Sequence, residues 1–142
     1  IYPMDTHHPQ LRHNLSGKFE SAFINVTIQP NNSILLDSLS GSRLGIWIAH
    51  GEGRFDLKSN ENAYKIPMKY SYDSFPGNPN GSSFGAAALS SKDGRHLAMM
   101  PHLERSIFPW NWSHHQNKMA HEVSPWIEPF VNARKWVAKK IK

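Results

Sequence analysis

Cysteine is absent from this 142-residue sequence, and its absence sets the first limits on the chemistry of the chain. Without a thiol the chain forms no disulfide framework and contains no cysteine nucleophile. No apolar run approaches the roughly 18 residues that cross a bilayer, and no secretory signal pattern is visible. We therefore expect a cytoplasmic protein with no membrane partner.

Acidic residues are scarce, with 11 Asp and Glu against 16 Lys and Arg, which gives a formal net charge of +5. The excess is concentrated in the last nine residues, and the remainder is close to neutral. A basic helix end is often a solvated surface that suits the helix dipole. We therefore expect no nucleic-acid partner, although a basic binding module stays open as an alternative. The five basic residues are Arg134, Lys135, Lys139, Lys140 and Lys142.

Two sets of polar residues suggest other classes of protein. Five Asn-x-Ser/Thr triplets are typical of a glycosylated secreted domain, but the triplet is short and common. Histidines cluster near both ends of the chain, and a zinc site would need three or four ligands with a supporting shell. With no cysteine and no matching carboxylate spacing, we predict no metal site. The triplets begin at Asn14, Asn25, Asn31, Asn80 and Asn111, and the histidines are His7, His8, His13, His114, His115 and His121.

Periodic apolar residues predict several strands and one helix in a single α/β domain. Residues 18–28 alternate like a strand, and residues 43–50 form an apolar run typical of a strand buried on both faces. Residues 64–72 suggest a weaker strand at an edge or bulge, because Pro67 interrupts them. Residues 86–100 form two apolar runs around an Asp-Gly pair, which is a strong hairpin signal.

The remaining segments predict a loop and two helices. Residues 74–85 are rich in Pro, Gly and Asn and predict a long loop. Residues 31–39 predict a short helix capped by Ser33. Residues 124–142 predict a closing helix that begins near residue 129, because Pro129 opposes an earlier regular start.

An acid–base pair follows the last predicted strand. His102 and Glu104 are two residues apart, so in an extended segment both side chains point to the same side. A carboxylate beside a histidine fixes its tautomer and favours the imidazolium. The alternative is a surface histidine with Glu104 paired to Arg105, and spacing alone does not decide between the two.

Two other features have ordinary structural explanations. The glycine-rich stretch AHGEGRF (49–55) follows a predicted buried strand, but it lacks the Lys-Ser/Thr ending of a P-loop and indicates a turn. The tryptophans Trp110, Trp112 and Trp126 are suited to stacking a base or sugar, yet tryptophan more often packs in a core.

Taken in order, four stretches resemble one family. They are AHGEGRF (49–55), NPNGS (78–82), DGRHLAMMPHLERS (93–106) and SPWIEPFVNARK (124–135). This order resembles the C-terminal glutamine amidotransferase domain, of the class I (triad) type, of the phosphoribosylformylglycinamidine synthases. Residues 12–23 are similar to the segment of that family soon after its nucleophile.

The resemblance implies a flavodoxin-like α/β fold with a mixed central sheet and a C-terminal helix. It also implies that His102 and Glu104 complete a triad with a cysteine, with Leu103 standing where the family usually has proline. That cysteine would lie upstream of Ile1. Residues 1–142 are then expected to be the later portion of one amidotransferase domain, inactive alone and with apolar surface left uncovered.

The resemblance further implies the reaction and its partners. The domain would release ammonia from glutamine for the ATP-dependent conversion of formylglycinamide ribonucleotide to formylglycinamidine ribonucleotide in purine biosynthesis. ATP and magnesium would bind in the synthetase part, and no cofactor is expected in this chain. The expected partners are glutamine, the upstream half of the domain and the synthetase domains.

Candidate glutamine-binding residues also follow from the resemblance. They are Asn14, Ser16 and Phe19, while His50 and Asn80 are expected to face the site or the interface with the synthetase part. Two alternatives stay open: a glutamine amidotransferase of another pathway, and a non-catalytic basic module whose nucleic-acid binding would depend on salt.

Overall fold

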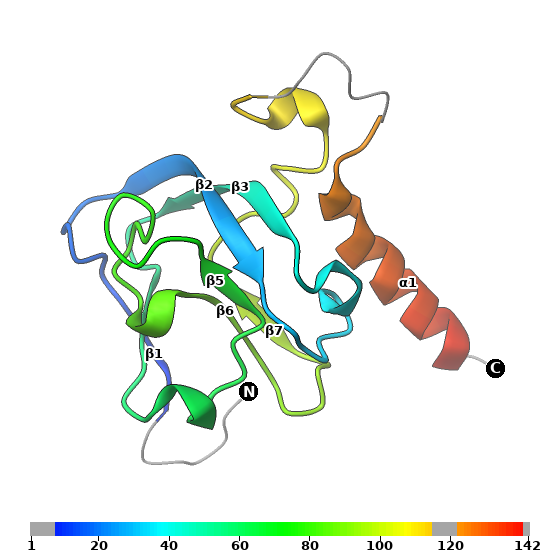
Figure 1. The fold of residues 1–142 in the computed structure, drawn as a ribbon, viewed down its shortest axis with the longest axis horizontal. Coiled ribbons are helices and arrows are strands. Elements are labelled where there is room, and N and C mark those ends of the chain that lie inside the picture. Colours follow the sequence, from blue (N-terminus) through cyan, green and yellow to red (C-terminus); the bar gives the residue numbers. More distant parts are fainter. Residues whose placement is uncertain (1–7, 115–121, 141–142) are drawn as a thin grey trace.

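The computed structural model describes residues 8–114 and 122–140, which form two antiparallel sheets and one α-helix (Figure 1). The larger sheet has the strand order β3-β2-β5-β6-β7, and the smaller one pairs β1 with β4. The strands are β1 (Gln10–Arg12), β2 (Glu20–Ile28), β3 (Arg43–His50), β4 (Arg54–Asp56), β5 (Met68–Tyr70), β6 (Ala86–Ser90) and β7 (Leu97–Met99), and the helix is α1 (Glu128–Lys140).

The long β2–β3 pair contributes the central apolar face of the core. Its register places Ile24 opposite Ile46 and Ala22 opposite Ile48, so one face of both strands is apolar. Ile46 and Ile48 are fully buried there. Alternation of side chains between the two faces of a strand explains why the period-two pattern identified β2 correctly. The expected strand at residues 43–50 is also confirmed.

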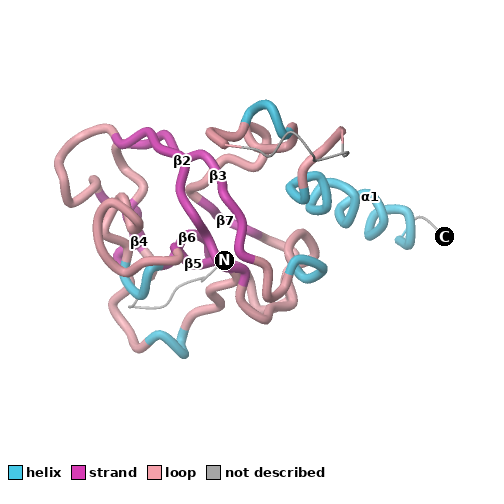
Figure 2. The backbone as a smooth tube through the Cα atoms, turned by 45° about the horizontal axis from the view of Figure 1, so that its top comes forward, coloured by secondary structure: helices cyan, strands magenta, loops and turns pink. Residues whose placement is uncertain are grey.

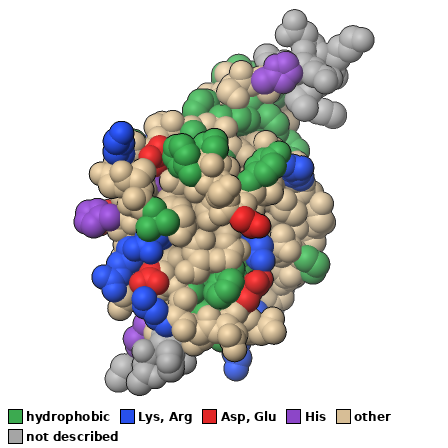
Figure 3. All heavy atoms as spheres, turned by 60° about the vertical axis from the view of Figure 1, so that its left-hand side comes forward, with side chains coloured by type: hydrophobic (Ala, Val, Ile, Leu, Met, Phe, Trp, Pro, Cys, Tyr) green, Lys and Arg blue, Asp and Glu red, His purple; other side chains and the backbone are tan. Residues whose placement is uncertain are grey.

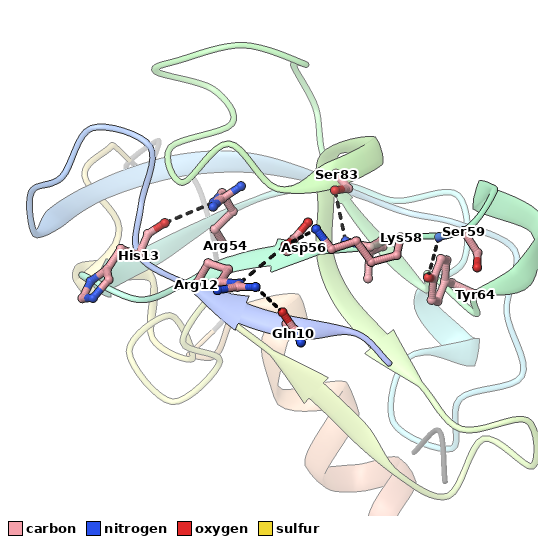
Figure 4. A network of polar contacts seen from close by, with 10 residues as sticks. Gln10, Arg12, His13, Arg54, Asp56, Lys58, Ser59, Tyr64 and Ser83 are labelled. Atoms are coloured by element: carbon pink, nitrogen blue, oxygen red, sulfur yellow. Dashed lines mark hydrogen bonds and ion pairs between the residues drawn. The ribbon is translucent and has the colours of Figure 1, made fainter. Parts of the chain in front are cut away.

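The smaller sheet carries a network of polar contacts (Figure 4). The carboxylate of Asp56 lies 2.7 Å from the Lys58 ammonium and 3.5 Å from the Arg12 guanidinium. The hydrogen bond from Lys58 lowers the pKa of the Asp56 carboxyl below its usual value. Arg54 donates from its side chain to the backbone oxygen of His13 at 3.1 Å, which ties β4 to the segment after β1.

The closing helix begins as the sequence predicts. A short 3₁₀ turn, Pro125–Ile127, precedes α1, and the Ser124 hydroxyl accepts a hydrogen bond from the Trp126 backbone N–H. Pro129 then falls in the first turn of α1, where a missing N–H is tolerated. Figure 2 shows α1 to one side of the strands, with its C-terminal end directed away from them.

The predicted helix at residues 31–39 is wrong. The chain there forms turns followed by a 3₁₀ turn at Asp37–Leu39, and the Ser33 hydroxyl makes no capping hydrogen bond. The segment is held instead by the β6–β7 hairpin. Ile34 donates its N–H to the Gly94 oxygen at 3.0 Å, and Asn32 donates from its side chain to the Lys92 oxygen at 2.8 Å. These tertiary contacts outweigh the local helical signal.

Other expectations are confirmed. The β6–β7 hairpin turns at Gly94, whose positive φ of 71° suits glycine. Strand β5 follows Pro67 and has a register shift between Met68 and Lys69, although it lies inside the sheet. The α/β class with a C-terminal helix is confirmed. Every strand ladder in the described residues is antiparallel.

Large apolar side chains stand at the surface in several places. Figure 3, which turns the β1 side toward the viewer, shows hydrophobic side chains between charged ones on this face. No helix within the described ranges is long and apolar enough to span a bilayer. The exposed side chains are Leu11, Leu15, Phe19, Tyr72, Phe75, Phe84, Phe108, Trp110, Val123, Phe130 and Val137.

Candidate functional site

His102 and Glu104 form the predicted contact. The His102 Nδ1 atom lies 2.8 Å from the Glu104 Oε1 atom, within the range of a direct hydrogen bond. The Glu104 carboxylate is 60% exposed and lies 3.7 Å from the Arg105 side chain, while the His102 side chain is only 28% exposed. The histidine contact is therefore the closer of the two that Glu104 makes, and it leaves Nε2 for another group.

The backbone of His102 is fixed to the sheet. Three residues after β7, the His102 N–H donates to the Trp47 carbonyl of β3 at 2.8 Å, forming an isolated antiparallel bridge. Strand β3 lies at the other end of the sheet order from β7. The bridge thus occupies the outer edge of β3 and places the acid–base pair beside the middle of that strand.

Ser106, which the sequence gave no reason to single out, connects this segment to the core. It is fully buried, and its hydroxyl donates to the His102 carbonyl at 3.3 Å while accepting from the Trp47 N–H at 3.3 Å. Its own carbonyl accepts from the Trp112 indole at 2.8 Å and from the Ser124 hydroxyl at 2.6 Å. One small buried residue therefore positions the segment that carries His102.

Two of the three tryptophans pack in or against the core, and the third is exposed. Trp126 is fully buried, and its indole donates to the Gly45 carbonyl at 2.7 Å. Trp112 is partly buried against the core. Trp110 is 66% exposed and stacks in parallel on Phe108, with ring centroids 4.6 Å apart. Packing is therefore the role of Trp112 and Trp126, and Trp110 stands at the surface.

His50 lies at the end of β3, opposite Glu20 of β2. Both ring nitrogens are buried, and neither has a hydrogen-bond partner in the described part of the chain. The ring packs so closely on Gly53 that a Cβ atom there would lie 2.5 Å from Nδ1. Burial lowers the pKa of the His50 imidazole; the residue's own backbone opposes this, the nearby charge of His102 adds to it, and Glu20 opposes it.

Asn14 is buried and holds the glycine-rich turn after β3. Its side-chain nitrogen donates to the Lys18 carbonyl at 2.8 Å and to the His50 carbonyl at 2.7 Å. Its side-chain oxygen accepts from the Gly53 N–H at 3.2 Å. Both amide hydrogens are thus engaged by the backbone, so the structure gives Asn14 a scaffolding position beneath the turn.

Asn80 holds the same turn from the opposite side. Its side-chain nitrogen donates to the Gly53 carbonyl at 2.6 Å and to the Tyr70 hydroxyl at 2.9 Å. Its side-chain oxygen accepts from the N–H and the hydroxyl of Ser82. The Ser82 hydroxyl in turn accepts from the Phe55 N–H at 3.0 Å. The stretches 49–55 and 78–82, recognised separately in the sequence, are one hydrogen-bonded unit.

Ser16 and Phe19 differ from Asn14 because they are exposed. The Ser16 hydroxyl makes only a local contact, accepting from the Lys18 N–H at 3.3 Å. The Phe19 side chain is 67% exposed, and its ring is the nearest group to the space beside Gly51. Phe19 precedes Glu20, which pairs with His50. Ser16 and Phe19 therefore belong to the surface around the end of β3.

Metal binding finds no support in the described residues. Among residues 8–114 and 122–140, no group of three or more His, Cys, Asp or Glu side chains is arranged to hold an ion. His7, His115 and His121 lie outside the described residues. The His13 ring lies 3.5 Å from the Glu52 carboxylate on an exposed surface.

Comparison with known proteins identifies the family of the chain. Residues 2–137 match a family described as the CobB/CobQ-like glutamine amidotransferase domain. The chain is 43% identical over 150 residues to a phosphoribosylformylglycinamidine synthase of Dictyostelium discoideum, covering 91% of the chain and 11% of the relative. It is 40% identical over 139 residues to the Homo sapiens enzyme of that name, covering 89% of the chain and 10% of the relative. The chain thus spans about a tenth of the length of these relatives.

A solved structure shows the same fold at lower identity. The structure titled PurLQS from Thermotoga maritima aligns with a TM-score of 0.69 and 22% identity, covering 92% of this chain and 53% of that one. The family match extends over nearly all of the residues that carry the sheet, the His102–Glu104 contact and α1. The chain belongs to the CobB/CobQ-like glutamine amidotransferase domain family.

Proposed function

We propose that this chain supplies the histidine and the carboxylate of a glutaminase site in a phosphoribosylformylglycinamidine synthase. The observation that carries the proposal is the 2.8 Å contact between His102 Nδ1 and Glu104 Oε1, in a segment fixed to β3 by the Trp47 bridge. The relatives that share 40–43% identity over nearly the whole chain carry that enzyme's name and support the assignment.

The proposed chemistry uses His102 as the base and then as the acid. His102 takes the proton of a cysteine thiol, and the thiolate attacks the side-chain amide carbon of glutamine. The imidazolium then protonates the departing nitrogen, which leaves as ammonia, and water later hydrolyses the thioester to glutamate. Glu104 holds the ring in one tautomer and stabilises its positive charge, as the aspartate does in serine hydrolases.

The thiol must come from outside these 142 residues, because the sequence contains no cysteine. We take residues 1–142 as the later portion of one amidotransferase domain and assign the thiol to an earlier portion of the same domain. That earlier portion and the synthetase domains are then its partners. Ser16 and Phe19, exposed near the end of β3, are proposed to border the glutamine pocket. Asn14 contributes by holding the turn beneath it.

Ammonia released at this site would serve the ATP-dependent formation of formylglycinamidine ribonucleotide elsewhere in the polypeptide. ATP and magnesium belong to that synthetase step, and this chain is proposed to bind neither. The proposed location is the cytoplasm. The Arabidopsis thaliana relative, 41% identical over 149 residues, is named chloroplastic/mitochondrial, so the compartment can differ between organisms.

The test is the ratio of glutamine-driven to ammonia-driven synthesis in the full-length enzyme. His102→Ala should abolish the glutamine-driven rate, while high ammonium should restore most of the product because external ammonia bypasses the histidine. Equal loss of both rates in a folded variant would show that His102 supports structure or the synthetase step, and would reject the proposal.

A second measurement addresses the chain alone. It should release glutamate from glutamine at the buffer rate, because the acid–base pair lacks a nucleophile. Turnover that survives purification and disappears in His102→Ala would contradict the assignment of the thiol to another portion of the polypeptide.

A further inference from the structure

A groove with an open strand edge lies beside the first half of β2. Within the described chain, β5 pairs with β2 only over residues 26–28, and one further hydrogen bond joins the Ser71 N–H to the Asn25 carbonyl. The segment after β5 then lies beside β2 without pairing (Figure 1), and the groove between them has a volume of about 440 Å³. Its lining residues are Ala22, Phe23, Ile24, Asn25, Tyr72, Ser74, Phe75, Pro76 and Gly77.

The backbone of β2 directs unpaired polar groups into this groove. In an antiparallel sheet, alternate residues of a strand direct their N–H and C=O groups to opposite edges. Asn25 accepts from Ser71 at 3.0 Å on the β5 side, whereas Ile28 donates at 2.9 Å to the segment entering β3. Odd-numbered residues of β2 therefore face β5. Ser21 and Phe23 lie beyond the paired part of that edge, and no described residue pairs with them there.

The chemistry of the groove indicates what fits it. Unpaired N–H and C=O groups along a strand edge are a site for pairing with another extended chain. None of the nine lining residues carries a charge, so a charged segment would lose its hydration there without gaining a partner. The groove therefore favours an uncharged extended peptide segment, whose backbone bonds to β2 and whose side chains pack on the apolar wall.

The wall opposite β2 is held in place by Asn78. This residue is buried, its N–H donates to the Ser74 carbonyl at 2.9 Å, and its side-chain nitrogen donates to the Asp73 carbonyl at 3.3 Å. Gly77 packs against Tyr72, where an added Cβ would lie 2.5 Å from the Tyr72 Cβ atom. Because contacts within the chain build both walls, the groove is formed without an occupant.

The same wall limits which extended segment can enter. A second copy of the chain would present this edge together with its own residues 72–77, so a single extended segment fits the groove better than a second folded edge. The chain spans only 10–11% of the relatives that it matches at 40–43% identity, and a polypeptide of that length contains many other segments.

We propose that the groove beside Ser21 and Phe23 receives an extended, uncharged segment from the remainder of the same polypeptide, paired edge to edge with β2. The inference rests on the proposed function, because that function places the chain within a larger synthase. It adds a docking surface on β2 to the site at His102, and it assigns backbone pairing as the means of attachment.

Hydrogen exchange of single amides in the full-length enzyme tests the proposal, with mass spectrometry at residue resolution. The N–H groups of Ala22 and Ile24 face β3 and are paired, whereas those of Ser21 and Phe23 face the groove. A docked strand should make all four amides exchange slowly, at rates within about tenfold of one another. Faster exchange of Ser21 and Phe23 than that range allows would overturn the proposal.

Protection measured at two enzyme concentrations identifies the occupant. A segment of the same polypeptide pairs with β2 at any concentration, so the exchange rates should be unchanged over a dilution of about a hundredfold. Protection that is lost on dilution would mean that a second copy occupies the edge, and would overturn the proposal. Amide exchange does not depend on glutamine hydrolysis, so this test and the test of His102 can fail separately.

Phe75→Asp tests whether the occupant lies in the groove. The Phe75 side chain is 64% exposed, so the substitution should leave the fold intact while it places a carboxylate in an uncharged lining. Exchange at Ser21 and Phe23 in the full-length enzyme should become about tenfold faster or more, with Ile24 unchanged. Phe130→Asp is the matched control, since Phe130 is 45% exposed on α1 and does not line the groove. Unchanged exchange in Phe75→Asp, or an equal change in the control, would overturn the proposal.

Discussion

Two histidines lie close to the same strand and have opposite surroundings. His102 is fixed beside the middle of β3, its Nδ1 atom contacts the Glu104 carboxylate, and part of its ring is exposed. His50 ends β3, with both ring nitrogens buried and unpartnered in the described chain. A histidine with a carboxylate can accept and hold a proton, whereas a buried one resists it. The comparison shows that one residue type has opposite surroundings at two places along one strand, and only His102 is proposed for proton transfer.

Removing the Glu104 carboxylate should leave the His102 ring without its hydrogen-bond partner, as the His50 ring is. In the full-length enzyme, Glu104→Ala should lower the glutamine-driven rate by about 10³–10⁴, the effect of losing the orienting carboxylate in serine hydrolases. Ammonia-driven synthesis should persist. The matched control is Arg105→Ala, because Arg105 contacts the same carboxylate at 3.7 Å on an exposed surface. A control loss as large as that of Glu104→Ala would remove the distinction between the two contacts.

Loosening the turn beneath His50 should cost stability. Asn80→Ala would leave the Gly53 carbonyl and the Tyr70 hydroxyl without their donor in a buried place. We expect a loss of about 3 kcal/mol in the free energy of unfolding, measured by urea denaturation. Asn62→Ala, at an exposed position, should change it by less than about 0.5 kcal/mol. Similar values for the two variants would mean that the network contributes little.

A smaller effect is expected from His50 on the pH dependence of stability. Because its pKa is lowered in the folded chain, His50 is neutral in both states above about pH 6.5, and there it adds no pH dependence. Below that pH the unfolded chain takes up the proton first, so stability falls as pH falls, by at most about 1.4 kcal/mol per pH unit.

His50→Phe keeps a flat ring on Gly53 and removes the titrating group. Urea denaturation between pH 7.5 and 5.5 should therefore show a smaller loss of stability in His50→Phe than in the unaltered chain. Besides burial, the pKa of His50 responds to its own backbone and to Glu20, which oppose the lowering, and to the charge of His102, which adds to it. Identical pH dependence in the two proteins would contradict the described burial of His50.

The smallest effect is expected in the half-exposed network around Asp56. Asp56→Asn should cost about 0.5 kcal/mol, since Arg12 and Lys58 are half exposed and such pairs are screened by solvent. The loss should shrink in 1 M salt, and unfolding measured at two salt concentrations tests this. A loss as large as that of Asn80→Ala would mean that surface pairs matter as much as the buried amides.

Local patterns predicted the parts of the fold whose signals are local. The alternation in β2, the apolar run of β3 and the Asp-Gly turn at Gly94 each depend on neighbouring residues. The segment at residues 31–39 was misjudged because hydrogen bonds to the carbonyl oxygens of Lys92 and Gly94, about 60 residues away, decide its shape. No local pattern reports such contacts.

The candidate site divides in the same way. Their spacing predicted that the side chains of His102 and Glu104 point to the same side, and in the structure the two are in contact. Asn14 is predicted to line the glutamine pocket, and no local pattern shows that its amide donates to the carbonyl of His50, 36 residues away. Ser106 gave no signal because its importance comes from four partners that converge only in the folded chain.

The side-chain amide of Asn80 is also open to slow deamidation. Asn80 is followed by Gly81, and an asparagine before glycine is the pairing most prone to spontaneous loss of its side-chain nitrogen in a flexible chain. That change would replace the donor to Gly53 and Tyr70 by a carboxylate oxygen, which only accepts while ionised. Complete burial slows the reaction by restricting the backbone. Deamidation at this dipeptide would therefore record how long each molecule has spent unfolded.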